Sequence, residues 1–576
     1  MSCALSPTSR TLPPRSMIHR AARASSGVPV MPASPVWPEA HPDGTPTPGL
    51  STAPPSTSRQ PTTTPRRFGY LSRLLHRRGP PAGAPEPRRC AVVELRDHEG
   101  RGLQCDAGWV RAPWWGPRSV ELALLALALA VVGLALFALQ VSGVGVAQAT
   151  SMRTWIGLAG LALVVHLVLR RVAKAADPLL LPIVVLLNGL GLVMIERLDA
   201  EAATKARAVG RAVPRPDAPL QLIWTALGIG CFLAVVLLVR DHTRTSRYTF
   251  TAAAVGLFLL IMPALPVIGT TINGARLWLR VGPFTVQPAE LAKIVLIVFF
   301  ASYLARTRDV LSLAGRRLGP LDLPRGRDLG PLLLAWGGSL AVLTVEHDLG
   351  LSVLFFGAFV AMLYLATNRI GWVLTALLLA VAGLLASFQL VHNVHNRIEV
   401  WLHPMRDALG AGYQPLQAKF ALGSGGLTGT GLGQGSPGLV PFANTDFMVS
   451  SLGEELGLVG LMAIVVLFAL LVERGFMIAL GCRDSYGKLL SAGLTTVLAL
   501  QVFFIVGGVT GLIPLTGVTL PWLSYGGSSV LSNWALIAVL ARISDASRQP
   551  QPALASPHLL RQDLAAAATQ AVRRPP

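Results

Sequence analysis

The stretch Pro441–Val472 reads PFANTDFMVSSLGEELGLVGLMAIVVLFALLV, and it joins a polar opening to an apolar run from Leu456 to Val472. A run of this kind predicts a helix that crosses a hydrocarbon core of about 30 Å. Asn444, Thr445 and Asp446 stand just ahead of the helical pattern, which is typical of a helix N-cap. The stretch therefore predicts a membrane-spanning helix with its polar end at a membrane surface.

Three carboxylates stand at the mouth of this predicted span, namely Asp446, Glu454 and Glu455. Ionisable groups at the edge of a bilayer are costly unless they are paired, hydrated or used in chemistry. Two interpretations follow. In the first, Asp446 only caps the helix and both glutamates lie at the level of the lipid headgroups. In the second, the carboxylates belong to a functional site.

Similar apolar stretches recur along the chain, whose 576 residues are 52% hydrophobic and only 14% charged. This composition is too apolar for a soluble globular protein. We therefore predict an all-α, polytopic integral membrane protein with about twelve transmembrane helices and a long outer loop. The predicted spans are 119–140, 152–171, 178–196, 219–239, 248–269, 287–304, 330–346, 349–366, 370–390, 447–472, 487–508 and 526–543.

The formal net charge of +20 is expected from Lys and Arg in cytoplasmic loops, and nucleic-acid binding is not predicted. The predicted inner loops include 306–327, which holds six arginines. This distribution favours cytoplasmic N- and C-termini. Residues 197–217 run against the rule, because they fall outside yet contain five basic residues.

The first 117 residues are rich in Pro, Ser, Thr and Arg, and such a segment is predicted to be a disordered, basic cytoplasmic tail. Residues 546–576 are predicted to form a second disordered cytoplasmic tail. The five cysteines show no CxxC or zinc-type spacing. We therefore expect no disulfide bond and no metal site built on cysteine.

Three unusual regions fall on the outer side in this topology, at 269–287, 391–445 and 511–529. The third is too interrupted by Pro and Gly for a helix and too apolar for a free loop. Irregular backbone at membrane depth must be buried in protein or line a cavity, so a re-entrant or surface-lying segment is predicted. Loops gathered on one side of a rigid scaffold are where sites are usually built.

Several residues in these regions could carry chemistry. Glu290 and Lys293 are three apart at the start of a span and share one helix face, as an internal ion pair or as part of a site. Arg276 offers a planar guanidinium that suits phosphate. Trp278 could stack on a sugar ring or simply join the interfacial aromatic belt.

Carboxylates, Arg, Lys and glycine backbone thus gather at an outer bilayer surface. The glycine-rich run Ser424–Gly435 lacks the Lys-Ser/Thr pair of a nucleotide-binding phosphate loop. A flexible loop that lets backbone approach a ligand is the better interpretation. The constellation suits a substrate with a lipid tail, a diphosphate and a polar head.

The motifs of these regions resemble those of a known family. NGARLWLRVGPFTVQPAELAK, EHDLG, GYQPLQ, GSGGLTGTGLGQG, NTDF, GEELGLVG and IPLTGVTLPWLSYGGSS occur in this order. Together they closely resemble the SEDS family (RodA, FtsW and SpoVE), and the details are closest to its actinobacterial RodA-type branch. The resemblance covers about 177–543 and implies a SEDS core at 177–545, with an outer loop at 391–446. Residues 118–176 then form two additional N-terminal helices.

The resemblance implies a peptidoglycan glycosyltransferase in the cytoplasmic membrane that polymerises lipid II at the outer face. Such activity would support cell elongation, shape or division. A class B penicillin-binding transpeptidase is the implied partner. A divalent cation, Mg²⁺ or Mn²⁺, is implied as cofactor, and no organic cofactor is. The family's catalytic aspartate falls on Asp446, its functional tryptophan on Trp278, and its acidic and basic pair on Glu290 and Lys293. Leu277 replaces a second basic residue that many members carry, which leaves Arg276 as the phosphate candidate of that loop.

The expected reaction is an inverting glycosyl transfer, in which a sugar hydroxyl displaces a lipid diphosphate. One carboxylate could serve as general base, and Asp446 is predicted to take the proton. Lys293, Arg276 or a cation would neutralise the diphosphate. If the helix ran on from Asp446, Glu454 would lie about 80° round its axis, so Glu454 is included among the substrate-binding candidates. Lipid II flipping and a non-catalytic scaffold are the alternative functions.

Overall fold

The computed structural model describes residues 116–549, except 147, 266–267, 273–274, 283, 314, 319–320, 325–329, 331–333, 335, 339–340, 342–347 and 391. Nearly all of the two predicted tails lies outside these residues. Ten helical segments within them are long and apolar enough to cross a membrane. The prediction of an all-α, multi-pass membrane protein is therefore confirmed.

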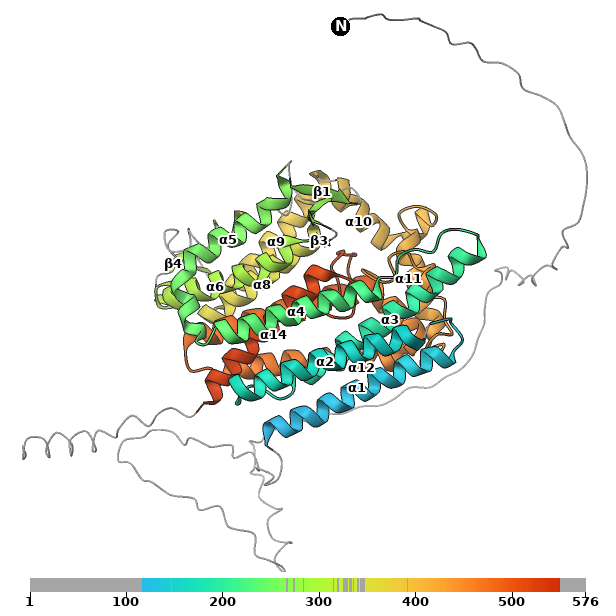
Figure 1. The fold of residues 1–576 in the computed structure, drawn as a ribbon. Coiled ribbons are helices and arrows are strands. Elements are labelled where there is room, and N and C mark those ends of the chain that lie inside the picture. Colours follow the sequence, from blue (N-terminus) through green and yellow to red (C-terminus); the bar gives the residue numbers. More distant parts are fainter. Residues whose placement is uncertain are drawn as a thin grey trace, which may run out of the picture. The chain divides into compact units, whose positions relative to one another are not determined.

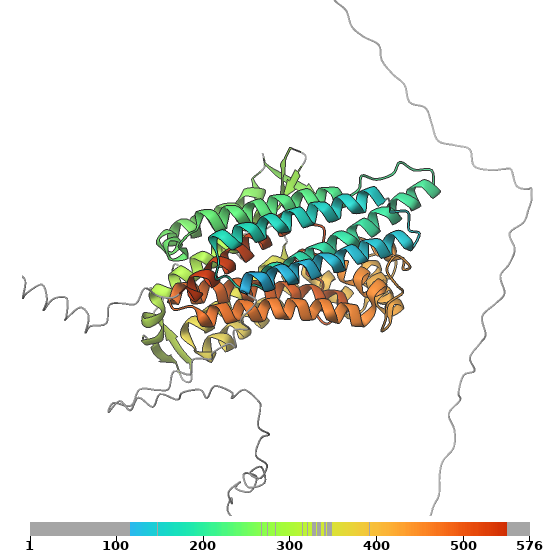
Figure 2. The ribbon, with the colours of Figure 1, turned by 60° about the horizontal axis from the view of Figure 1, so that its bottom comes forward.

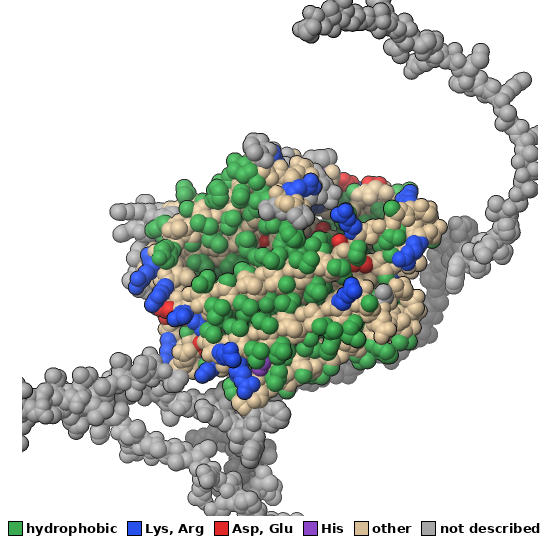
Figure 3. All heavy atoms as spheres, viewed as in Figure 1, with side chains coloured by type: hydrophobic (Ala, Val, Ile, Leu, Met, Phe, Trp, Pro, Cys, Tyr) green, Lys and Arg blue, Asp and Glu red, His purple; other side chains and the backbone are tan. Residues whose placement is uncertain are grey.

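The long helices run alongside one another in a bundle (Figures 1 and 2). The ten candidate spans are α1 (Pro117–Val141), α2 (Gln148–Val172), α3 (Leu180–Ala208), α4 (Ala218–Leu238), the combined η1 (His242–Tyr248), α5 (Thr249–Ile261) and η2 (Met262–Ala264), α6 (Pro288–Leu313), α8 (Leu349–Thr367), α12 (Met448–Gly481), α13 (Ser485–Thr510) and α14 (Gly527–Arg548). Hydrophobic side chains cover the middle of the bundle, and Lys and Arg gather toward its ends (Figure 3).

The predicted count of twelve helices stays a prediction. The predicted span 370–390 is present as the helix α9 (Ile370–Leu390), although it is not among the ten candidate spans. The predicted span 330–346 lies mostly outside the described residues. Several helices run well beyond their predicted ends, among them α3 to Ala208, α6 to Leu313 and α12 to Gly481. Their polar ends extend the helices beyond the apolar stretches on which the prediction was based.

The helices α1 and α2 pack against the rest of the bundle through α3 and α4. Within the bundle, α4 packs against α14, α12 against α13, and α5 against α6. Polar contacts also anchor α2, because Ser151 and Thr154 donate hydrogen bonds to the buried Glu196 of α3. The two N-terminal helices are therefore integral parts of the packed bundle.

The outer regions are more ordered than the sequence predicts. Residues 269–286 form an antiparallel sheet of β1 (Gly269–Ile272), β2 (Ala275–Val281) and β3 (Phe284–Val286), with Thr270 opposite Trp278. The region 391–446 contains α10 (His392–Leu402), η3 (Pro404–Asp407), α11 (Tyr413–Gly425) and η4 (Pro437–Leu439). At the other end of the bundle (Figure 1), the predicted inner loop carries the hairpin β4 (Gly315–Leu318) and β5 (Leu321–Pro324).

A break in α12 receives the glycine-rich loop that follows α11. Gly457 lies in this helix with φ 69° and ψ −174°, which is not helical. The freed carbonyls of Glu454 and Glu455 accept hydrogen bonds from the Thr430 and Gly431 amides. A Cβ atom at Gly457 would lie 2.2 Å from the Gly429 amide nitrogen. Glycine is therefore required both by the backbone angle and by the close approach of the loop.

Two of the five basic residues in the segment 197–217, Arg197 and Lys205, are paired with carboxylates of the protein. Arg197 Nε lies 2.8 Å from Glu455 Oε1, and the Arg197 guanidinium also pairs with Glu201 at 3.0 Å. Lys205 Nζ pairs with the other carboxylate oxygen of Glu201, Oε1, at 2.7 Å. Charges that are neutralised within the protein do not need the headgroups or water of one particular membrane side.

The segment between α13 and α14 is irregular and buried, as predicted. Val518, Leu520, Trp522 and Leu523 are all buried. The Gln501 amide donates to the Thr519 carbonyl at 2.9 Å, and the Gln221 amide donates to the Ser524 carbonyl at 3.2 Å. Neighbouring helices thus satisfy its backbone, which irregular chain inside a membrane protein requires.

We expect Gly191→Ala to destabilise the protein, because α3 passes directly over this irregular segment. A Cβ atom at Gly191 would lie 2.6 Å from the carbonyl oxygens of both Trp522 and Leu523. Overpacking of this kind costs about 1–3 kcal/mol, so the thermal unfolding midpoint in detergent should fall. Gly230→Ala on α4 is the matched control, because nothing lies within 4 Å of its Cβ position. Equal midpoints for the two variants would contradict the packing described here.

Candidate functional site

Asp446 lies in the turn before α12, which begins at Met448 with Phe447 as N-cap residue and has no side-chain capping bond. The capping interpretation of Asp446 is therefore wrong. Within the described residues, its half-buried carboxylate has no hydrogen-bond partner, and its electrostatic neighbour is Arg397. A carboxylate held near a cation but not hydrogen-bonded to the protein is available to a ligand.

The backbone around Asp446 is fixed by its neighbours. The side-chain amide of Asn444 donates to Asp217 Oδ2 at 2.8 Å. The backbone carbonyl of Asn444 accepts a hydrogen bond from the backbone amide of Tyr525 at 2.7 Å. The Thr445 carbonyl accepts from Ser524 Oγ at 2.6 Å. The turn is thus tied to the start of α4 and to the irregular segment before α14, while the Asp446 side chain stays free of these ties.

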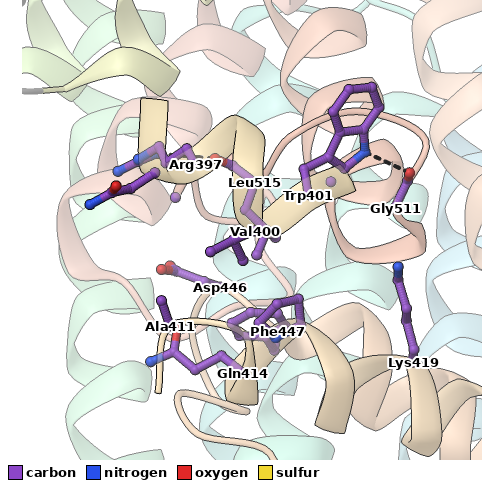
Figure 4. A pocket seen from close by; sticks show the side chains of 14 residues that line it. Arg397, Val400, Trp401, Ala411, Gln414, Lys419, Asp446, Phe447, Gly511 and Leu515 are labelled. Atoms are coloured by element: carbon purple, nitrogen blue, oxygen red, sulfur yellow. Dashed lines mark hydrogen bonds between the residues drawn. The ribbon is translucent and has the colours of Figure 1, made fainter. Parts of the chain in front are cut away.

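Two adjoining cavities of about 410 and 280 Å³ both include Asp446, Arg397 and Gly517 in their walls. The larger cavity is also lined by Trp278, Gln287, Glu290 and Asp348. The smaller cavity is also lined by Trp401, Gln414 and Lys419. Figure 4 shows Asp446 and Arg397 on one side of the smaller cavity and Lys419 on the other. Asp446 therefore stands where the two cavities meet.

Burial governs the protonation of this site. It raises the pKa of Asp446 to about 6, and the charge of Arg397 opposes the rise. Burial also raises the pKa of Asp348 to about 6, against a hydrogen bond from the Leu351 amide, while Glu290 and Asp446 add to the rise. Both carboxyls thus titrate just below neutral pH, where a general base is most useful.

Glu290 and Lys293 form the buried ion pair that their spacing predicts. Lys293 Nζ donates to Glu290 Oε2 at 2.6 Å and to Gln501 Oε1 at 2.9 Å. Ser532 Oγ donates to the same Glu290 oxygen at 2.9 Å. Glu290 reaches the larger cavity, whereas Lys293 is only 1% exposed and lies outside the lining of both cavities. Lys293 thus holds Glu290 from behind.

Arg276 and Trp278 sit on the same strand but differ in placement. Trp278 lines the larger cavity. One Arg276 Nη donates to the carbonyls of Leu265 and Gly269, and Arg276 lies outside the lining of both cavities. It therefore ties β2 to the end of the preceding helical span. The cationic side chains that face the cavities are Arg397 and Lys419.

Glu454 is also placed away from the cavities. Its Oε1 accepts a hydrogen bond from the Ser436 amide at 2.8 Å, and Glu455 accepts one from the Gly433 amide at 3.0 Å. Both side chains hold the glycine-rich loop. The predicted geometry required a helix that starts before Asp446, whereas the observed helix starts after it.

Arg397 and Lys419 were not among the predicted site residues. Each is a single basic residue within the 391–446 region, and no glycine or proline pattern marks its position. Asp348 was not among the predicted site residues either, and the charge of Arg397 acts on its carboxyl. Arg397 and Lys419 reach the cavities because α10 and α11 fold over the end of the bundle, whereas Asp348 is placed there as the N-cap residue of α8.

The cavity carboxylates offer hard oxygen ligands that suit Mg²⁺ or Mn²⁺. However, Glu290 already accepts hydrogen bonds from Lys293 and Ser532, and Asp348 accepts one from the Leu351 amide. In the part of the chain that the structure describes, the cavity carboxylates do not bring three ligand oxygens within 4.8 Å of one another. These carboxylates therefore do not form a three-ligand site by themselves, although Mg²⁺ commonly uses only one or two carboxylates together with water and phosphate. The expected divalent cation stays a prediction from the resemblance, and no chemical step is assigned to it.

Comparisons with known proteins bear on this geometry. The family model of FtsW, RodA and SpoVE, described as "Cell cycle protein", matches residues 178–549. A protein of Mycobacterium tuberculosis named "Peptidoglycan glycosyltransferase RodA" is 47% identical over 386 residues, which cover 67% of this chain and 81% of the relative. The protein of the same name from Mycobacterium leprae is 44% identical and covers 71% and 86%.

One solved structure carries the description "Structural coordination of polymerization and crosslinking by a peptidoglycan synthase complex". It aligns with a TM-score of 0.51 at 26% identity, over 65% of this chain and 99% of the solved chain.

Proposed function

The chain belongs to the FtsW/RodA/SpoVE family and is a peptidoglycan glycosyltransferase, and on that premise we propose that Asp446 is its general base. The substrate we propose is lipid II. The observation that carries the proposal is the half-buried, unpartnered Asp446 carboxylate at the junction of two cavities. Glu290, Lys293 and Trp278, which the resemblance also selected, lie in or directly behind the wall of the larger cavity.

The two cavities suit the two substrates of a glycosyl transfer. We assign the donor diphosphate to the smaller cavity, because Lys419 and Arg397 both face it. The acceptor sugar is assigned to the larger cavity, where Trp278 offers an aromatic face and Gln287, Glu290 and Asp348 offer hydrogen-bonding groups. Asp446 contacts both spaces, so it can take the proton of the acceptor hydroxyl as that oxygen attacks the anomeric carbon.

The charges in this site match the needs of the leaving group. A diphosphate leaves as an anion and needs charge neutralisation, which positioned cations supply. Arg397 is held by its hydrogen bond to the Leu515 carbonyl at 3.0 Å. Lys419 is exposed and lies beside Gly511, where a Cβ atom would be 3.1 Å from Nζ.

The protein is a multi-pass membrane protein, and we propose that it lies in the cytoplasmic membrane with both termini inside. The arginine-rich segment 306–327 supports this orientation. The site would then face outward, where peptidoglycan is assembled. The solved relative belongs to a complex that coordinates polymerisation and crosslinking, which supports a class B penicillin-binding transpeptidase as partner.

The decisive experiment measures lipid II polymerisation by the purified protein with its transpeptidase partner. We expect Asp446→Asn to lower the rate about 10²- to 10⁴-fold, the usual contribution of a general base. The amide keeps the shape of the side chain but cannot accept the proton. Thermal stability and partner binding, measured on both proteins, should remain unchanged.

Three other outcomes would contradict parts of the proposal. A folded Asp446→Asn variant with full activity would remove Asp446 from the mechanism. Transbilayer movement of lipid II in proteoliposomes without polymer formation would favour the flippase alternative. Failure of the wild type to polymerise or to flip lipid II, under conditions that support a known polymerase, would favour a scaffold.

We expect the rate to depend on pH through Asp446. The active form is the carboxylate, and burial raises its pKa to about 6. The value of kcat/KM should therefore be constant above this pH and fall about tenfold per pH unit below it. Because Asp348 titrates in the same range, the Asp348→Asn variant is measured in parallel. A flat profile from pH 5 to pH 8 would exclude a carboxylate base with a pKa near 6.

We expect Lys419→Met to lower the polymerisation rate about 100-fold, as loss of one charge-stabilising group commonly does. Lys488→Met is the matched control, because Lys488 is an exposed lysine near the start of α13, at the other end of that helix from Gly511. Initial rates with saturating lipid II measure the effect. Equal rates for both variants would place the diphosphate elsewhere.

A further inference from the structure

One group of described residues does bring three metal-ligand atoms together, and it lies far from the cavities. Ligand atoms of His242, Cys482 and Asp484 are all within 4.8 Å of one another. His242 and Cys482 are buried, and Asp484 is partly exposed. In the described part of the chain this is the single group of three or more such residues with that spacing.

The three residues come from two turns at the end of the bundle opposite the cavities. His242 is the first residue of η1, which follows α4. Cys482 is the C-cap residue of α12, and Asp484 is the N-cap residue of α13. Both α4 and α12 begin beside the Asp446 turn and end here. The spacing of the cysteines alone predicted no metal site, because His242 is distant in sequence and only the fold brings it to Cys482.

The group is held in place before any ion binds. His242 Nε2 lies 3.0 Å from Asp484 Oδ1, and Asp484 Oδ2 accepts a hydrogen bond from the Gly487 amide at 2.6 Å. The imidazole stacks on the Tyr486 ring with 14° between the planes. A Cβ atom at Gly487 would lie 2.6 Å from His242 Nε2 and about 3 Å from both Asp484 oxygens. Glycine at this position thus leaves room for the pair.

We propose that His242 Nε2, Cys482 Sγ and Asp484 Oδ1 bind one zinc ion, with water as the fourth ligand. Imidazole, thiolate and carboxylate are the three ligand types that zinc uses, whereas Mg²⁺ and Ca²⁺ avoid sulfur. Zinc bonds of about 2.0–2.3 Å hold tetrahedral ligand atoms about 3.3–3.8 Å apart. The present separations, all within 4.8 Å, are within about 1.5 Å of that spacing.

The protons balance simply. A free cysteine thiol carries its proton at neutral pH. Zinc displaces that proton to solvent as the zinc–sulfur bond forms. His242 Nε2 donates to Asp484 Oδ1 in the free protein, so zinc binding requires the imidazole proton to move to Nδ1 and leaves the Nε2 lone pair for the metal. Once bound, the ion links the end of α4 to the turn between α12 and α13.

The test uses the full-length protein in detergent, purified with a tag that contains no histidines. Cys3, Cys90 and Cys105 are replaced by Ser so that thiolate signals come from Cys231 or Cys482. After treatment with a chelator, the protein is titrated with Co²⁺ and then with Zn²⁺. We expect one Co²⁺ per chain, a sulfur-to-cobalt charge-transfer band that Zn²⁺ abolishes, and a zinc-dependent rise in the thermal midpoint.

Variants assign the ligands. Cys482→Ser should lose the charge-transfer band and the zinc-dependent rise, and His242→Gln should keep the thiol but weaken binding at least about 10-fold. Cys231→Ser is the matched control and should behave like its parent, because Cys231 lies in the middle of α4. No charge-transfer band in the parent protein, or a band that survives Cys482→Ser, would overturn the proposal. If Cys482→Ser does not fold, unchanged Co²⁺ affinity in His242→Gln would overturn it.

Discussion

The architecture of the bundle end that carries the cavities depends on the break in α12 at Gly457. A continuous helix there would use the carbonyls of Glu454 and Glu455 in its own ladder. The break releases both carbonyls, and the backbone amides of Thr430 and Gly431 donate hydrogen bonds to them. The side chains of the same two glutamates then bond the amides of Ser436 and Gly433. One helix interruption thus fixes a loop that would otherwise have no regular structure.

The site contains two kinds of polar residue. Some hold neighbouring protein groups in position, and others face the cavities. Lys293 donates to Glu290 and Gln501, and one Arg276 Nη donates to backbone carbonyls outside the cavities. Arg397 and Lys419 point to the cavities instead. Asp446 belongs to the second group, because its turn is tied by Asn444 and Thr445 while its own carboxylate is not. A buried charge that is already paired helps to hold the shape of the site. A charged side chain with fewer protein partners can bind a ligand.

Much of the fold could be predicted from hydropathy, because each span must be apolar over the thickness of the membrane. The ends of α3 and α12 could not, since a helix that leaves the bilayer can continue with Arg197 or Glu473 once these residues find partners. The recognised motifs selected Asp446, Trp278 and Glu290, which do line the larger cavity. The directions in which side chains point could not be predicted from the sequence. Glu454 was placed by a helical wheel that began too early, and Arg276 was chosen over Arg397 because it lies in a motif.

The glycine-rich loop has an unusual kind of vulnerability. Most contacts in proteins are lost when a side chain is shortened. Here the loop is docked by main-chain atoms, and Gly429 and Gly457 approach so closely that a Cβ on either would meet backbone 2.2 Å away. Docking of this loop therefore depends on the absence of a Cβ atom at both glycines. In an alanine scan, substitutions at these glycines would add an atom rather than remove one. They would therefore test a steric clash and not the loss of a contact.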